Sequence, residues 1–461
     1  MNSQTSDTLE RIKRIVTPHD RAPIDAVIRP FQRFIDAEEA GGIVLIVCTA
    51  IALFWANSAW ADSYHALWET HLRIALGPWT LDYPLHHWVN DALMAIFFFY
   101  VGLEIKREIL IGELSSARNA ALPIAAAIGG MIVPALIYTL FNAGTPAAHG
   151  WGVPMATDIA FALGILALLG RRIPFGLTVF LAALAIADDL GAVVVIAVFY
   201  SDNIAFGALG IAGAFLVFLM IANRSGVRRT FVYVFLGVFV WLAVLKSGVH
   251  ATVAGVLIAM TVPTRTVINS IQFARRTRQL TDEFEALGVS EEDILGADDQ
   301  EAVVQALETT CEQAQAPSQR MEHGLSKWVS FVIMPVFALA NAGIVFEGDF
   351  FGALLLPVTL GVALGLVVGK QIGITLFSWI AVRLGIGALP QGVTWRHIYG
   401  AALLGGIGFT MSLFIAGLGF GDPVLLNEAK VGILVGSLVS AILGWLVLRS
   451  APEKPLAESA P

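Results

Sequence analysis

The chain has 461 residues, of which 57% are hydrophobic and only 14% are charged, and its formal net charge is −8. A soluble domain carries roughly 25% charged residues, whereas apolar runs long enough to cross a bilayer recur along this sequence. The composition therefore excludes a soluble globular protein and indicates a polytopic membrane protein. Residues 1–39 are polar and lack a cleavage pattern, so no signal peptide is expected. The two cysteines, Cys48 and Cys311, do not support a disulfide framework.

The apolar runs predict twelve membrane-spanning helices. They cover about residues 40–58, 90–109, 120–141, 151–169, 174–200, 203–222, 230–245, 247–263, 328–346, 352–381, 397–419 and 429–448. The seventh and eighth runs are short and are separated only by "KSG", so the count is least certain there.

The basic residues predict how these spans are oriented. If the N-terminus is cytoplasmic, 24 of the 28 lysines and arginines fall in cytoplasmic segments. Only Arg73, Lys246 and Lys430 fall outside, and Lys370 lies within the tenth span. Cytoplasmic loops of membrane proteins are enriched in Lys and Arg. We therefore expect both termini in the cytoplasm, and the regular alternation supports twelve spans.

Polar segments divide the chain into regions. We expect a cytoplasmic segment at 1–39, helices one to eight within 40–263 with an extracytoplasmic loop at 59–89, an acidic cytoplasmic insert at 264–327, helices nine to twelve within 328–448 and a cytoplasmic tail at 449–461. In the outer loop, "LRIALGPWTLDY" (72–83) is typical of a β-hairpin, with a plain surface loop as the alternative. The insert is typical of one or two amphipathic helices or a partly disordered spacer, more than of a regulatory module.

Four charged residues lie deep within the predicted spans. Asp158 is in the fourth, the adjacent Asp188 and Asp189 are in the fifth, and Lys370 is in the tenth. Each such residue costs about 2.5–3.5 kcal/mol on insertion scales, and such residues usually mark an ion or proton pathway. Pairing that only holds the fold together is the alternative, but one lysine cannot neutralise both neighbouring aspartates. The aspartate pair therefore predicts a functional site.

Carboxylate oxygens suit hard cations such as Na⁺ and Mg²⁺ and also take protons. Without nearby Cys or His, a zinc or copper site is disfavoured. Burial and a neighbouring carboxylate both favour the protonated acid, so the pair should titrate as a coupled unit. A proton and a cation then compete for the same oxygens. That competition is sufficient for exchange if the site opens to one side at a time. Because adjacent helical residues point about 100° apart, one aspartate can bind an ion while the other pairs with Lys370.

Two stretches are candidates for interrupted helices within the membrane. "GVPMATDIA" places Pro154 and Thr157 just before Asp158, and "LLGGIGFTMS" places three glycines in the eleventh span. Backbone freed at membrane depth must be satisfied by protein or by a water-lined cavity, and charged side chains can offset the partial charges of the broken ends. Close packing of unbroken helices explains the glycines equally well.

The sequence resembles the NhaA family of Na⁺/H⁺ antiporters over about residues 30–263 and 320–450. The strings that carry the resemblance, in family order, are "WVNDALMAIFFFYVGLEIKREI", "AAIGGMIVPALIY", "ATDIAFALG", "AIADDLGAVVVIA", "VLKSGVHATVAGV", "PVFALANAG", "GKQIGI" and "GIGFTMSLFIAGLGF". This resemblance implies an all-α polytopic membrane protein with twelve helices, an inverted repeat, and interrupted fourth and eleventh helices that cross at the membrane midplane.

The resemblance also implies roles for the intramembrane residues. Asp188 and Asp189 match the family's ion- and proton-carrying pair and would be the Na⁺ ligands. Thr157 and Asp158 match the residues beside them, and Lys370 matches a charge-compensating lysine that pairs with the first aspartate. The implied activity is exchange of one Na⁺ or Li⁺ leaving for two protons entering, which moves net charge. It needs no cofactor and belongs in a bacterial inner membrane, where it serves pH and sodium homeostasis.

Regulation is implied in the same way. The pH-sensing candidates are Glu104, Glu108, Glu322, His323 and His250, whereas Ser326 stands where the family has a second histidine. Interfacial charge paired with Lys106, Arg107 and Arg320 is the alternative for the three glutamates. The 72–83 hairpin matches a dimerisation element, so a homodimer in the lipid bilayer is expected, and no nucleic-acid partner.

Three other functions also use charged residues within a membrane. An intramembrane aspartyl protease needs its two aspartates on different helices, whereas this pair is contiguous. A sodium-coupled symporter of an organic solute would need a larger set of polar residues at membrane depth. An ion channel would conduct without tight coupling to protons. The sequence favours the antiporter.

Overall fold

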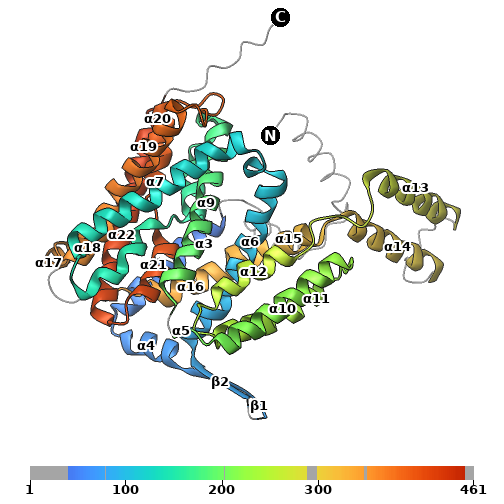
Figure 1. Ribbon diagram of the computed structural model, residues 1–461, viewed down its shortest axis with the longest axis horizontal. Coiled ribbons are helices and arrows are strands. Elements are labelled where there is room, and N and C mark those ends of the chain that lie inside the picture. Colours follow the sequence, from blue (N-terminus) through green and yellow to red (C-terminus); the bar gives the residue numbers. More distant parts are fainter. Residues whose placement is uncertain (1–39, 78, 202, 288–297, 347–349, 452–461) are drawn as a thin grey trace, which may run out of the picture.

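A computed structural model describes residues 40–77, 79–201, 203–287, 298–346 and 350–451 of the chain. The described part is predominantly helical (Figure 1), and its only sheet is one two-stranded hairpin. The predicted N-terminal segment 1–39 and residues 452–461 of the predicted tail lie outside the described residues.

Eight helical segments of the described chain are long and apolar enough to cross a membrane. They are Leu85–Ile111 (α5, a π-helical turn and α6), Ala117–Asn142 (α7), Pro146–Leu168 (a 3₁₀ segment and α8), Phe175–Phe199 (α9), Phe206–Arg224 (α10), Pro317–Asn341 (α15, a π-helical turn and α16), Pro357–Arg383 (α18, a π-helical turn and α19) and Pro423–Arg449 (α22). These segments confirm a multi-pass membrane protein.

Two bent pairs of helices and two short apolar helices complete the set in the described residues. The bent pairs are α3 (Ala40–Ala56) with α4 (Ala61–Glu69), bent by 112°, and α20 (Trp395–Leu404) with α21 (Phe409–Gly419), bent by 48°. The predicted seventh and eighth runs are separate short helices, α11 (Thr230–Leu245) and α12 (Thr252–Thr261). Within the described residues, the helices long and apolar enough to cross a membrane number eight, or up to ten if each bent pair is one span.

Three of the long spans contain a π-helical turn between two α-helices. The turns are Val89–Leu93 between α5 (Leu85–Trp88) and α6 (Met94–Ile111), Val329–Ile333 between α15 (Pro317–Trp328) and α16 (Met334–Asn341), and Gly365–Gly369 between α18 (Pro357–Leu364) and α19 (Lys370–Arg383). The ninth span therefore begins at Pro317, earlier than the 328 expected from the sequence. Glu322 lies on this helix and not in a loop.

The centre of the bundle is formed around α9. In the most apolar 18-residue stretch of α9, 61% of the residues are buried inside the protein. The corresponding value for α10 is 11%, so α10 lies at the edge of the protein. Figure 1 shows α10 and α11 side by side at this edge and α9 among the other helices. Most of this stretch of α9 is consequently shielded from lipid by protein.

Helices α7 and α19 approach so closely that only glycine fits at their contact. A Cβ on Gly373 would lie 2.0 Å from the Gly129 carbonyl oxygen, and a Cβ on Gly129 would lie 2.3 Å from the Gly373 oxygen. Small residues allow such close backbone packing in membranes. This contact fixes the start of α19, which is Lys370, against the centre of the bundle.

The fourth and eleventh predicted spans are interrupted and touch at their breaks. In the fourth, a 3₁₀ segment (Pro146–Met155) gives way to extended backbone before α8 (Ile159–Leu168) begins. In the eleventh, α20 ends at Leu404 and α21 starts at Phe409. The Asp158 amide donates to the Ile407 carbonyl at 2.6 Å. The prediction of interrupted helices is confirmed, and each break supplies hydrogen-bond partners for the other.

The 72–83 stretch forms the predicted β-hairpin. Strand β1 (His71–Leu76) pairs antiparallel with β2 (Trp79–Pro84), in a register that places Arg73 opposite Asp82. The His71 Nδ1 atom lies 2.8 Å from Asp82 Oδ1. The hairpin projects from the helical body (Figure 1), and Leu72 and Ile74 on it are exposed.

The insert contains two helices, which confirms its amphipathic pattern. Helices α13 (Ser270–Ala286) and α14 (Asp298–Ala314) pack together and extend away from the bundle (Figure 1). A capping box formed by Asn269 and Gln272 starts α13, and Arg276 donates to Gln313 at 2.8 Å. Residues 288–297 of the insert lie outside the described residues.

Candidate functional site

Helix α9 carries the two adjacent aspartates into the protein interior. Asp188 and Asp189 are 1% and 2% exposed, in the middle of a helix of otherwise apolar and small side chains. Their Oδ1 atoms are buried and accept no hydrogen bond from the described residues. Two adjacent ionised acids of this kind are costly, and a counter-charge, a bound cation or protonation lowers that cost.

Lys370 supplies a counter-charge to Asp188. Its Nζ atom lies 2.7 Å from Asp188 Oδ2, and both side chains are 1% exposed. The ammonium also donates to the Thr157 hydroxyl at 2.9 Å, and that hydroxyl donates to the Gly405 carbonyl at 2.8 Å. The structure thus brings together the first aspartate, the lysine and the break in both interrupted spans.

Asp158 lies between the N-termini of two helices. Its Oδ1 accepts from the Phe161 amide at 3.2 Å, which caps α8. Its Oδ2 accepts from the Thr410 amide at 3.1 Å, and from the Thr410 hydroxyl in a second hydrogen bond. Helix N-termini carry partial positive charge, so this carboxylate is held by two of them. The sequence interpretation missed Thr410, because its partner is 252 residues away and no local pattern links them.

A cavity of about 400 Å³ connects the second aspartate with Asp158. Asp189, Asp158 and Thr410 line it, and so does Glu104. Asp188, Lys370 and Thr157 are not among its lining residues. The two adjacent aspartates therefore have different surroundings: Asp188 is paired within protein, and Asp189 faces a cavity that can admit an ion.

The predicted glutamate cluster assembles around one arginine. Arg107 lies 3.1 Å from Glu108 and 3.9 Å from Glu104, and it contacts Glu322 directly. The expected pairing of these acids with a nearby basic residue is therefore present through Arg107. Lys106 instead donates to the carbonyl oxygens of Met260 and Val262 at the end of α12, at 2.6 and 2.5 Å.

Two residues of the predicted sensing set remain, His323 and His250. His323 is exposed beside Glu322 on α15. His250 lies elsewhere: its Nε2 atom is 3.3 Å from Asp91 Oδ1, in a separate cavity of about 340 Å³. Arg320, the third expected basic partner, contacts Glu312 at 3.2 Å. Asp91 also lies 2.8 Å from His87. The sequence interpretation missed Asp91 and His87, whose i, i+4 spacing was the available signal.

A family model described as Na⁺/H⁺ antiporter 1 matches residues 32–448 of this chain. The chain belongs to this family. It is 51% identical over 435 residues to the Na⁺/H⁺ antiporter NhaA of Syntrophobacter fumaroxidans, covering 93% of this chain and 92% of that protein. It is 52% identical over 437 residues to the NhaA of Acidithiobacillus ferrooxidans, covering 93% and 99%. The NhaA of Koribacter versatilis is 51% identical over 433 residues, covering 92% of each chain.

The Na⁺/H⁺ antiporter 1 family is a family of transporters, and the geometry agrees with this against the protease alternative. The sequence contains one Gly-x-Gly-Asp stretch, at 419–422. Its Asp422 is exposed and caps α22, accepting from the Val424 amide at 2.9 Å. This aspartate is therefore no partner for Asp188 or Asp189. Family membership also does not favour the alternative of sodium-coupled symport.

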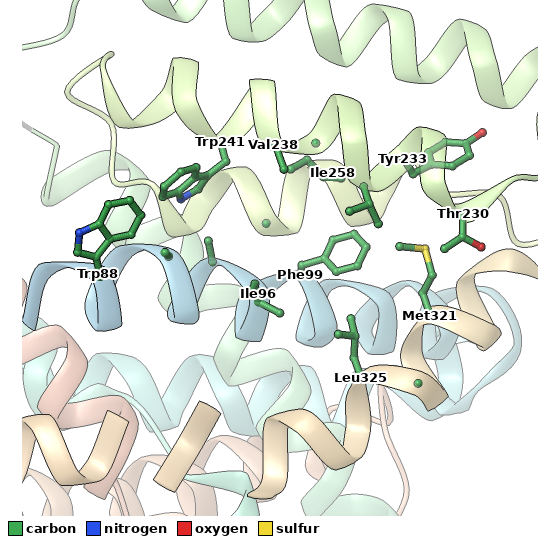
Figure 2. Close-up of a pocket in the computed structure, with 16 residues that line it drawn as sticks. Trp88, Ile96, Phe99, Thr230, Tyr233, Val238, Trp241, Ile258, Met321 and Leu325 are labelled. Atoms are coloured by element: carbon green, nitrogen blue, oxygen red, sulfur yellow. The ribbon is translucent and has the colours of Figure 1, made fainter. Parts of the chain in front are cut away.

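A second pocket of this protein is lined mainly by apolar side chains. A groove of about 590 Å³ is lined by residues of α5, α6, α11, α12 and α15, with Trp88 beside Trp241 at one end and Tyr233 and Met321 at the other (Figure 2). None of the side chains that line it is charged. A groove of this composition suits apolar groups and not an ion, so the cavity beside Asp189 is the candidate ion route.

Proposed function

We propose that this protein exports Na⁺ in exchange for protons by alternating access. The relatives with about 50% identity over most of the chain are named Na⁺/H⁺ antiporters. Na⁺ and H⁺ are the proposed substrates, and Asp188 and Asp189 are the proposed carriers. Thr157 and Asp158 complete the site in this proposal, and Lys370 compensates charge.

The observation that carries this proposal is that the two adjacent aspartates have different surroundings. One lysine neutralises Asp188, and Asp189 is left to face a cavity shared with Asp158. An unprotonated Asp189 attracts a cation strongly in a site of low dielectric. Its protonation removes that charge and releases the ion. A carboxylate that binds either a proton or Na⁺, but not both together, couples the two fluxes by this competition alone.

Proton uptake at Asp188 provides the coupling to movement. When Asp188 is protonated, its ion pair with Lys370 weakens, and the lysine is free to change partner. The interrupted segments that meet at Gly405 and Ile407 are the elements that respond, because both the lysine and Thr157 contact them. We propose two protons entering for one Na⁺ or Li⁺ leaving, an electrogenic cycle that needs no cofactor.

The proposed architecture has twelve spans. The eight long helices, the two bent pairs and the short α11 and α12 support this number. A long helix, an interrupted segment and a second long helix occur in the order α7, α8, α9 and again α19, α20–α21, α22. This recurrence supports an inverted repeat with the breaks crossing near the midplane. The basic-residue bias supports cytoplasmic termini in a bacterial inner membrane.

Regulation by pH is proposed at two places. The Arg107 cluster adjoins the cavity through Glu104, so a change in its charge acts on ion entry. His250 and Asp91 form the second place. His323 is exposed where it can meet solvent protons. These groups would make exchange depend on pH and so serve pH and sodium homeostasis.

A homodimer in the bilayer is proposed through the β-hairpin. Leu72 and Ile74 are exposed on the projecting strand β1 and offer apolar surface to a second copy. Replacing residues 72–83 by a short Gly-Ser linker should convert the purified dimer to a monomer, as measured by light scattering. A dimer that persists after this replacement would exclude the hairpin as the interface.

The decisive experiment is Na⁺-induced dissipation of a pH gradient in everted vesicles or proteoliposomes, from about pH 6 to about pH 9. The wild type should exchange, and Asp189→Asn should abolish exchange while the protein still inserts. Asp188→Asn should do nearly the same. Full exchange by both variants would refute the assignment.

A further inference from the structure

Two threonines meet at the break between the interrupted spans, and their hydroxyls are engaged differently. Thr157 uses most of its capacity: its hydroxyl donates to the Gly405 carbonyl and accepts from Lys370 Nζ. It does not line the cavity that reaches Asp189. A hydroxyl has one donor and two acceptor positions, so Thr157 has little capacity left for an ion in this arrangement.

Thr410 has the capacity that Thr157 lacks. Its hydroxyl hydrogen is directed to Asp158 Oδ2, and its oxygen accepts no hydrogen bond from the residues that the structure describes. Both lone pairs of that oxygen remain for a cation, and donation to a carboxylate makes them more negative. Thr410 lines the same cavity as Asp158 and Asp189. Hydroxyl and carboxylate oxygens together are the ligand type that hard cations prefer.

We infer that the cation site is formed by Asp189, Asp158 and the hydroxyl of Thr410, and that Thr157 belongs to the set that compensates charge with Asp188 and Lys370. This inference rests on the proposed antiport and refines which residues touch the ion. It assigns a neutral ligand to α21, so the site is shared between α9, the start of α8 and the start of α21.

This assignment links ion binding to the helix breaks. Thr410 binds Asp158 through its backbone amide as well as its hydroxyl, so a cation held by both residues bridges the N-termini of α8 and α21. Binding of Na⁺ to the deprotonated site neutralises a negative charge between two helix ends. The ion itself therefore acts on the two segments that alternating access must move.

The test compares Thr410→Val, which removes the hydroxyl at nearly constant shape, with Thr410→Ser, which keeps it. Ser437→Ala is the matched control: Ser437 is buried and accepts from the Phe409 amide at the start of α21, but it does not line the cavity. Rates are measured in proteoliposomes over a series of Na⁺ and of Li⁺ concentrations at one alkaline pH, beside wild type and Asp189→Asn.

We expect Thr410→Val to raise the apparent KM for Na⁺ about tenfold with the maximum rate within about twofold, the pattern of a lost binding interaction. The KM values for Na⁺ and Li⁺ should rise unequally, since a lost ligand affects ions of different size differently. Thr410→Ser and Ser437→Ala should stay within about threefold of wild type.

Three results would overturn the inference. An unchanged KM in Thr410→Val would exclude Thr410 as a ligand. An equal rise for Na⁺ and Li⁺ would show that the hydroxyl acts only by orienting Asp158. A Thr410→Ser variant as impaired as Thr410→Val would show that the β-methyl matters and not the oxygen. Absence of exchange in the wild type would instead refute the proposed function, and this inference with it.

Discussion

Lys370 and Asp188 form an ion pair that is almost completely removed from solvent, with Nζ 2.7 Å from Oδ2 and each side chain 1% exposed. The neighbouring Asp189 is equally buried but has no such partner and faces a cavity. Two chemically identical residues next to each other on one helix are therefore not equivalent. One is paired within the protein, and the other lines a cavity.

The first prediction separates the two aspartates by stability. Asp188→Asn leaves the Lys370 ammonium buried without a counter-charge and should lower the free energy of unfolding by about 3–5 kcal/mol. Asp189→Asn removes an unpaired buried charge and should be neutral or slightly stabilising. Thermal unfolding of the purified variants in detergent measures this. Equal melting temperatures for the two variants would contradict the unequal pairing, whatever their activities.

A second prediction concerns the lysine. Lys370→Met should destabilise the protein, because Asp188 then lacks its partner. The double variant Asp188→Asn with Lys370→Met should regain much of the lost stability, since a buried pair replaced by neutral groups of similar size is often tolerated. The double-mutant cycle, measured by thermal unfolding, isolates the interaction. Additive losses in the double variant would show that the two residues do not stabilise each other.

A third prediction concerns the arginine shared by three glutamates. Arg107→Ala leaves Glu104, Glu108 and Glu322 without a common cation, and their mutual repulsion favours proton binding. The pH of half-maximal exchange should therefore rise by about one unit. Lys106→Ala is the control, because Lys106 contacts carbonyl oxygens of α12 and no carboxylate within the described residues. It should reduce stability without moving the profile, and identical profiles for the two variants would refute a sensing role for the cluster.

The sequence predicted those residues of the site whose charge is unusual in an apolar segment. Charged residues in apolar runs are conspicuous, so Asp158, Asp188, Asp189 and Lys370 were identified from the chain alone. The helix breaks were candidates from Pro154 before Asp158 and from the glycines of the eleventh span, with close packing of unbroken helices as the equal alternative. The partner of Lys370 was expected only by resemblance, because helical geometry places either aspartate within reach, and the structure gives it as Asp188.

Other features could not be predicted, and the reason is distance along the chain. Thr410 contacts Asp158 across 252 positions, and threonine in an apolar helix is common. The separation of His250 from the Arg107 cluster depends on how complete helices pack. The early start of the ninth span was missed because polar residues of Pro317–Trp328 continue the polar character of the insert. Periodicity describes one segment at a time and does not report which segments meet.

The last prediction tests the contact that holds Lys370 in place. Gly373 lies one helical turn after Lys370, and a Cβ there would lie 2.0 Å from the Gly129 carbonyl oxygen on α7. Since backbone atoms cannot yield as a flexible side chain does, Gly373→Ala should push α7 and α19 apart, lower the melting temperature and reduce exchange. Gly210→Ala is the control, because nothing lies within 4 Å of a Cβ at that position on α10, and alanine favours a helix by about 1 kcal/mol over glycine. It should leave exchange unchanged and stability equal or higher. Full activity and an unchanged melting temperature in Gly373→Ala would show that the close approach of the two helices is not needed to position the lysine.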